Sequence, residues 1–109
     1  MVKVTIYKGQ ADIYAGFDCT GHADYAEKGS DIICAGVSAL VINTINSISC
    51  LTDDVATTDS NEKTGRISMK FEKQASYDAN LLIKSLILGL QGIQKNYGNE
   101  YIMLIFKEV

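Results

Sequence analysis

The sequence contains no proline and no tryptophan, and it has a single histidine and a single arginine in 109 residues. With a formal net charge of −3, the scarcity of arginine argues against direct nucleic-acid binding, which requires a basic surface. No apolar run approaches the roughly 20 residues that cross a bilayer, and the alternating N-terminus lacks the features of a signal peptide. Three cysteines without CxxC spacing predict a reduced, cytoplasmic protein without a disulfide framework.

Composition places the chain among ordinary globular domains. Hydrophobic residues make up 47% and charged residues 21% of the chain, which matches folded proteins rather than disordered, fibrous or repeat proteins. At this length, roughly two-thirds of the surface of the unfolded chain can be buried on folding. We therefore expect residues 1–109 to form a single domain with its own hydrophobic core.

Five segments have the pattern of β-strands. In the first, Val2, Val4 and Ile6 alternate with polar residues, as on a half-buried strand. The last is apolar at every position, which predicts that it is covered on both faces, by helices or by a second subunit. The predicted strands cover residues 2–7, 13–20, 55–59, 67–72 and 101–106.

Two segments have the pattern of helices. The first runs from a cap at Ser30 or Asp31 to about Leu51, and because its first half is apolar on nearly every side, we expect protein all around it. The second runs from a cap at Ser76 to about Tyr97. The order ββαββαβ predicts an α+β class: a compact layered fold of a mostly antiparallel or mixed β-sheet and two main helices.

The main candidates for chemistry are the only histidine, His22, and a cysteine near the start of the first helix, Cys34. The free N–H groups and the positive dipole end of a helix favour the anionic, nucleophilic form of a cysteine. The same N–H groups can hold the oxyanion of a tetrahedral intermediate, and an imidazole can take the proton of the thiol. The pair therefore predicts acyl transfer by a thiol nucleophile.

Four nearby residues are candidates for supporting roles. Asp31 can cap the helix or orient the histidine, although its charge opposes formation of the thiolate. Ser38 lies one turn after the cysteine and can hydrogen-bond the sulfur, the substrate or its own helix. Gly21 and Gly29 flank most of the loop that carries the histidine, and as hinges they can let this loop close over a peptide.

Structural explanations compete with this prediction. A cysteine in an apolar helix is commonly a small core residue, and a loop histidine is commonly a surface residue. Cys19 and Cys50 lack a capped helix start, so we expect packed, inert thiols there. A zinc site built from Cys19, His22 and Cys34 would need a fourth ligand. The acidic run 53–62 can attract a cationic peptide or simply form a solvated hairpin edge.

Two sequence blocks, GHADYA at 21–26 and GSDIICAGVSAL at 29–40, resemble the ribosomal-processing cysteine protease (Prp) family of Firmicutes and related bacteria. The separation of the blocks, the chain length and the order of strands and helices are also similar to that family. The resemblance therefore covers essentially the whole chain. Gly36 is a small departure, because many relatives carry alanine there.

The resemblance implies a cytoplasmic endopeptidase that removes a short N-terminal extension from a protein of the large ribosomal subunit, a step of ribosome assembly. It implies cleavage after a hydrophobic, aromatic-rich motif, with Cys34 as nucleophile, His22 as general base, and Asp31 and Ser38 in supporting roles. It also implies a mobile loop over about 21–30 and a homodimer. We expect no cofactor, no metal and no membrane partner. The alternatives are a noncatalytic ribosome-associated binding module and a metal-binding regulator.

Overall fold

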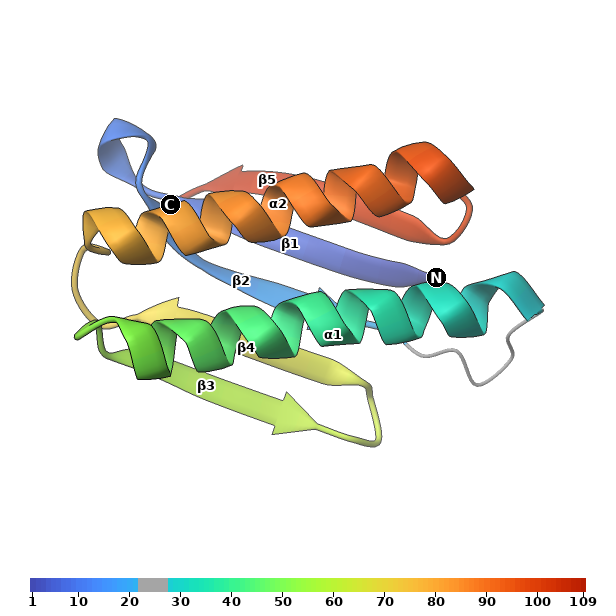
Figure 1. The fold of residues 1–109 in the computed structure, drawn as a ribbon, viewed down its shortest axis with the longest axis horizontal. Helices are drawn as coiled ribbons and strands as arrows, with labels where there is room; N and C mark the ends of the chain where they lie inside the picture. The colour runs from blue at the N-terminus through green and yellow to red at the C-terminus, as the bar shows by residue number, and fades with distance from the viewer. Residues whose placement is uncertain (22–27) are drawn as a thin grey trace.

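Five strands form one mixed sheet, and two long helices lie across it (Figure 1). The computed structural model describes residues 1–21 and 28–109, with only the backbone of residues 28–31. The strand order across the sheet is β3-β4-β2-β1-β5, and the predicted ββαββαβ order and α+β class are confirmed. The elements are β1 (Val2–Lys8), a 3-10 turn (Gln10–Asp12), β2 (Tyr14–Thr20), α1 (Lys28–Leu51), β3 (Ala56–Asn61), β4 (Arg66–Phe71), α2 (Tyr77–Tyr97) and β5 (Ile102–Glu108).

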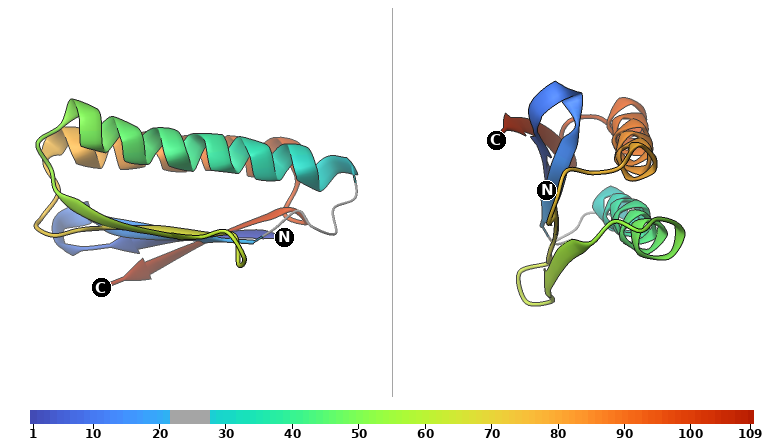
Figure 2. Two further views of the ribbon diagram at one scale, coloured as in Figure 1. Left: turned by 90° about the horizontal axis from the view of Figure 1, so that it is seen from below. Right: turned by 90° about the vertical axis from the view of Figure 1, so that its left-hand side faces the viewer.

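Both helices cover the same face of the sheet (Figure 2). α1 connects β2 to β3 and α2 connects β4 to β5, so each helix crosses between strands that are not neighbours. β2 and β4 are antiparallel, and the two crossovers travel in opposite directions across the sheet. Right-handed crossovers are strongly favoured. Compared with the connection through α1, the connection through α2 starts from a strand that runs the opposite way and also moves the opposite way across the sheet. Both right-handed connections therefore place their helix on the same face. The sequence order therefore produces two layers.

The hydrophobic core lies between the sheet and the two helices. On β1, the alternate residues from Val2 to Ile6 are at most 5% exposed, as the alternating pattern predicted. The two helices approach each other closely where Leu40 of α1 meets Gly89 of α2, since a Cβ atom added at Gly89 would lie 3.0 Å from the Leu40 side chain. A glycine inside a helix therefore serves packing at this position.

α1 begins earlier and is less enclosed than the sequence predicted. Its first residue is Lys28, so the predicted caps Ser30 and Asp31 lie inside its first turn. Cys34, six residues after Lys28, lies in the second turn rather than the first. Ile32 is 66% exposed, because α1 packs with only one of its sides against the other described residues. The expected helix start and the expectation of a fully surrounded first half are therefore wrong.

By length and composition, α1 could also cross a membrane over the stretch Ile32–Leu51. In the fold, however, its apolar residues at three- and four-residue spacing belong to the hydrophobic core. Val37, Val41 and Ile48 are at most 2% exposed. This stretch is therefore a core helix that packs on the sheet.

Among the described residues, only one face of β5 is covered. It pairs in parallel with β1, with Ile102 beside Val2, so alternate residues of the two strands share the face that the helices cover. Met103, on the opposite face, is 43% exposed. Both helices lie on the same side of the sheet (Figure 2), so the prediction that helices cover both faces of β5 is wrong. Coverage by a second subunit stays a prediction.

Candidate active site

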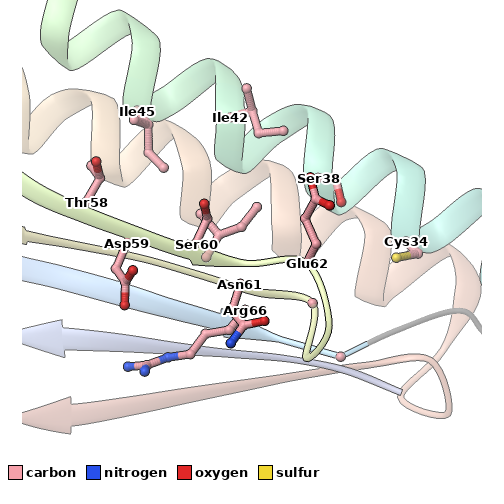
Figure 3. Close-up of a pocket in the computed structure, with 13 residues that line it drawn as sticks. Cys34, Ser38, Ile42, Ile45, Thr58, Asp59, Ser60, Asn61, Glu62 and Arg66 are labelled. Atoms are coloured by element: carbon pink, nitrogen blue, oxygen red, sulfur yellow. The ribbon is translucent and has the colours of Figure 1, made fainter.

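A groove of about 530 Å³ lies between α1 and the β3–β4 hairpin (Figure 3). Cys34 is half-buried and lines this groove, so its thiol borders an open space instead of being sealed in the core. Gly21, at the end of β2, also lines it. The other lining residues are Ser38, Ile42, Ile45, Thr58, Asp59, Ser60, Asn61, Glu62, Gly65, Arg66 and Ile67.

One stripe of residues on α1 forms the helical wall of the groove. Cys34, Ser38, Ile42 and Ile45 are separated by four, four and three residues, a spacing that places side chains on one side of an α-helix. Ile42 is 47% exposed although it is apolar. The stripe therefore offers a thiol and a hydroxyl at one end and an uncovered apolar surface along the rest (Figure 3).

The hydroxyl of Ser38 is not used by its own helix. On the same helix, the Thr44 hydroxyl donates to the Leu40 carbonyl oxygen at 2.7 Å. Within the part of the chain that the structure describes, Ser38 bonds neither to a helix carbonyl nor to the sulfur of Cys34. A hydroxyl that lines the groove without an internal partner is available to a bound peptide, which was one of its three predicted roles.

The rim of the groove carries negative charge. Asp59 and Glu62 line it on the hairpin side and are exposed. The one lining arginine, Arg66, is already engaged, because its Nε donates to Oδ1 of Asp18 at 2.9 Å. This hydrogen bond raises the pKa of Arg66. The acidic residues Asp59 and Glu62 of the 53–62 run therefore border the groove and also form part of the solvated hairpin edge.

The three cysteines are free thiols that differ in their access to solvent. Cys19 is 6% exposed, and burial raises its pKa to about 11, with a smaller contribution from Cys34. It therefore remains neutral at physiological pH, and the prediction of a packed thiol is confirmed. Cys50 is exposed, so the same prediction is wrong there. It lies at the end of α1, where the next residue, Leu51, is 74% exposed.

Gly21 has a backbone conformation and a position that only glycine fits. Its φ is +123°, and a Cβ atom there would overlap the carbonyl oxygen of Met1. The chain therefore leaves β2 at a fixed point beside β1. Gly29 lies in the first turn of α1, so a loop reaching Ser30 is longer than the structure allows. The hinge roles of both glycines stay predictions.

His22 lies outside the described residues, and so does the side chain of Asp31. The pairing of His22 with Cys34 and the role of Asp31 therefore stay predictions. In the described ranges 1–21 and 28–109, no three metal-ligating side chains come together. The zinc alternative includes His22 and is likewise outside what the structure describes.

Sequence reasoning missed the apolar part of the groove. Extending the four-residue spacing from Cys34 through Ser38 would have reached Ile42 and so identified the helical wall. The hairpin wall, with Thr58 and Ser60, had no comparable signal, because packing between distant segments brings β3 beside α1.

The structure is a two-layer α+β domain with a half-buried thiol at the end of an open, partly apolar groove, an arrangement typical of the class of enzymes that use a thiol nucleophile. Comparison with known proteins narrows this class. The sequence profile of the family described as cysteine protease Prp matches residues 1–102. The chain belongs to this family, and its predicted resemblance is confirmed.

Relatives of known name match nearly the whole chain. The ribosomal processing cysteine protease Prp of Bacillus subtilis (strain 168) is 33% identical over 101 residues, which cover 89% of this chain and 90% of the relative. An essential ribosomal processing protease Prp from S. aureus, solved in complex with a substrate peptide, has a TM-score of 0.91 at 29% identity, over 98% of this chain and 100% of that one. A second S. aureus structure, with a covalently linked product peptide, has a TM-score of 0.87 at 30% identity and the same coverage.

Proposed function

We propose that this protein is a Cys–His endopeptidase that removes the short N-terminal extension of a large-subunit ribosomal protein, in the cytoplasm, as a step of ribosome assembly. The observation that carries the proposal is the placement of Cys34 at one end of an open groove with an apolar wall, in a chain of the Prp family. The S. aureus relative bound to a substrate peptide supports a peptide as the occupant.

In this mechanism, Cys34 is the nucleophile and His22 is the general base. The imidazole takes the thiol proton, and the sulfur attacks the carbonyl carbon of the scissile peptide bond. When the C–N bond breaks, the departing amine takes the proton back from His22, and the peptide remains bound to sulfur as a thioester. Water then attacks the thioester and regenerates the thiol. The S. aureus relative with a covalently linked product peptide supports covalent chemistry.

Fewer free backbone N–H groups are available beside Cys34 to stabilise the oxyanion than if the helix began at Asp31. In a helix that begins at Lys28, the N–H of Cys34 belongs to the i→i−4 hydrogen-bond ladder, and the free N–H groups are those of the first turn. The Ser38 hydroxyl lines the groove beside the sulfur and lacks an internal partner among the described residues. It is the described side chain most suited to donate to a substrate carbonyl.

Apolar substrate side chains fit the helical wall. Ile42 and Ile45 line the groove beyond Ser38, and Ile67 of β4 also lines it. Burying one large apolar side chain there would contribute about 1.5–3 kcal/mol to binding. We therefore assign these isoleucines to the residues that precede the cleaved bond, where the hydrophobic motif of the extension lies.

The same proposal includes a homodimer. The face of β5 that the helices leave uncovered presents Met103, which is 43% exposed, next to the half-buried Ile105. A second copy would cover this apolar strand. Sedimentation velocity should give the mass of a dimer for the wild type and of a monomer for Ile105→Glu; a monomeric wild type would contradict this part.

The proposed activity is tested with a synthetic peptide that spans the extension and the first residues of the mature ribosomal protein from the same organism. Mass spectrometry should show two fragments with the wild type. Cys34→Ala should lower the cleavage rate by at least 10³-fold, and His22→Ala should be nearly as severe. Cleavage by Cys34→Ala at the wild-type rate would overturn the proposal.

Two controls separate loss of chemistry from loss of structure. Cys50→Ala removes an exposed thiol outside the groove and should cleave at the wild-type rate. Circular dichroism should give the same thermal midpoint for Cys34→Ala as for the wild type within a few degrees. A folded wild type that binds the peptide without cutting it would favour the noncatalytic binding module instead.

A further inference from the structure

Among the residues that the structure describes, β3 leaves one side of its backbone without a partner. It is the last strand of the described sheet and pairs there only with β4. The N–H of Glu72 donates to the carbonyl oxygen of Val55 at 3.0 Å, which makes these two residues a hydrogen-bonded pair. In an antiparallel ladder such pairs alternate, so Thr57 and Asp59 direct their backbone groups at β4. Thr58 and Ser60 therefore direct theirs away from the sheet.

The outward backbone groups of Thr58 and Ser60 are available. Both residues are exposed, and neither forms a backbone hydrogen bond outside the β3–β4 ladder within residues 1–21 and 28–109. Their side chains share the face of their partners Met69 and Ile67, which is the face that the helices cover. Each of the two residues thus offers a side chain to the groove and an unpaired backbone to the open edge.

The groove borders this free edge. Five consecutive residues, Thr58–Glu62, line it, although successive side chains of a strand point to opposite faces. Such a run requires the groove to follow the backbone of the strand as well as its face. The run of five residues measures about 13 Å at roughly 3.3 Å per residue. The helical stripe opposite, from Cys34 to Ile45, spans about 16 Å at roughly 1.5 Å per residue.

We propose that the substrate peptide binds in an extended conformation as an added strand on the edge of β3. This inference rests on the proposed function, since the peptide is the chain that Cys34 cleaves. Its backbone pairs with the outward groups of Thr58 and Ser60, and alternate side chains point at the wall formed by Ile42 and Ile45. Main-chain hydrogen bonds then hold the peptide, while alternate pockets select its sequence.

A peptide fits this edge better than a second copy of the chain. Cys34 lies in the same groove, so a second copy on β3 would block the thiol that must reach the substrate. The wall also provides apolar contacts on α1 that a bare edge-to-edge pairing of two β3 strands would leave uncovered. The S. aureus relative, with a TM-score of 0.91, was solved with a substrate peptide bound.

The geometry makes selectivity alternate along the peptide. Side chains of an added strand that face α1 bury apolar surface, whereas those between them point away from the groove. Peptide N–H groups also alternate between facing β3 and facing solvent. N-methylation of the amides that face β3 should raise KM at least tenfold, and N-methylation of the intervening amides should change it less than threefold.

Amide hydrogen exchange tests the inference directly. The Cys34→Ala variant, which should not cleave, is mixed with the synthetic extension peptide, and exchange is followed by NMR. The amides of Thr58 and Ser60 should be protected at least tenfold by the peptide. Those of Thr57 and Asp59 on the same strand already pair with β4 and should change little, so they are internal controls.

The outcomes separate this inference from the proposed function. If the wild type cleaves the peptide but Thr58 and Ser60 gain no protection while Ile42 shifts on binding, the added strand is overturned and proteolysis stands. Protection that appears without peptide and rises with protein concentration would assign the edge to a second copy and also overturn it. If the wild type does not cleave the peptide, both proposals fail.

Discussion

Cys34 and Ser38 lie one helical turn apart on the same side of α1, and both line the groove against the β3–β4 hairpin. The half-buried thiol and hydroxyl therefore face the same groove. In the proposed mechanism, this arrangement would link the chemistry at the sulfur to peptide binding along the helix, since the apolar stripe continues from Ser38 to Ile42.

Replacing Ser38 with alanine should lower kcat/KM about tenfold, because one hydrogen bond to the substrate, worth about 1–1.5 kcal/mol, is lost. The thermal midpoint should change little, since Ser38 has no hydrogen-bond partner among the described residues. Ser47→Ala, at a half-buried serine of the same helix outside the groove, is the matched control. Equal kcat/KM for both variants would remove Ser38 from the site.

Gly21→Ala should destabilise the fold by about 3 kcal/mol, because it combines a φ of +123° with overlap against Met1. Gly98→Ala is the control, since Gly98 also has a positive φ, of +93°, but no atom within 4 Å of an added Cβ. It should cost less, about 1–2 kcal/mol, because only the backbone conformation is strained there. Urea unfolding measures both, and equal losses would show that the contact with Met1 is unimportant.

The buried thiol of Cys19 should make stability depend on alkaline pH. Burial raises its pKa from 9.0 to about 11, so the folded state retains a proton that the unfolded state releases. This contribution to the free energy of unfolding is complete below pH 9 and is lost as pH rises through 11. The loss amounts to about 2 kcal/mol by pH 11.

Other groups also titrate in this range, so the comparison is between the wild type and Cys19→Ala. Chemical unfolding at pH 8 and at pH 11 gives the difference in free energy between the two proteins. We expect this difference to shrink by about 2 kcal/mol at the higher pH. A difference that is the same at both values would contradict burial of a neutral thiol.

Asp54 and Ser76 form a second testable connection, between the loop after α1 and the start of α2. The Asp54 carboxylate accepts hydrogen bonds from the Ser76 hydroxyl and, at 2.8 Å, from the Ser76 N–H. The Ser76 oxygen in turn caps α2 by accepting from the Ala79 N–H at 3.1 Å. Burial opposes the charged form of Asp54, but the hydrogen bonds outweigh it and lower its pKa.

Ser76→Ala should therefore cost about 1 kcal/mol through loss of the cap, and Asp54→Ala should cost a similar amount. Because the two residues share bonds, the double variant should cost less than the sum. A lowered pKa means that the contribution of Asp54 is present at neutral pH and is lost as pH falls through the folded pKa. Exact additivity in urea unfolding would show that the two residues act independently.

The sequence predicted the fold because its strands and helices have clear periodicity. Alternation from Val2 to Ile6 matched buried positions. In α2 the helical spacing located the helix, but of the residues that carried it Leu86 and Leu90 are buried whereas Leu81 and Tyr97 are more than 50% exposed. The start of α1 was predicted too late, because Lys28 and Gly29 carry no apolar pattern that would extend the helix backwards. Exposure of Cys50 was missed, because local sequence does not show which side of the last turn of α1 faces the core; Ile48 is 2% exposed there, whereas Leu51 is 74% exposed.

The site could be predicted only where it is local in sequence. Cys34 and Ser38 lie on one helix, so their spacing alone placed them on one side. The wall formed by Thr58 and Ser60 depends on how α1 crosses to the edge of the sheet, a contact between segments far apart in the chain. The free edge of β3 likewise follows from strand order, which periodicity does not determine.

The most direct measurement of the central claim is the loss of activity that accompanies alkylation of Cys34. In a Cys50→Ala background, iodoacetamide is added in steps, and the labelled fraction of Cys34 and the cleavage rate are measured on the same samples. We predict that activity falls in proportion to labelling of Cys34. We also predict that adding the substrate peptide slows both the labelling and the loss of activity. A protein with Cys34 fully alkylated that still cleaves at the original rate would contradict the account.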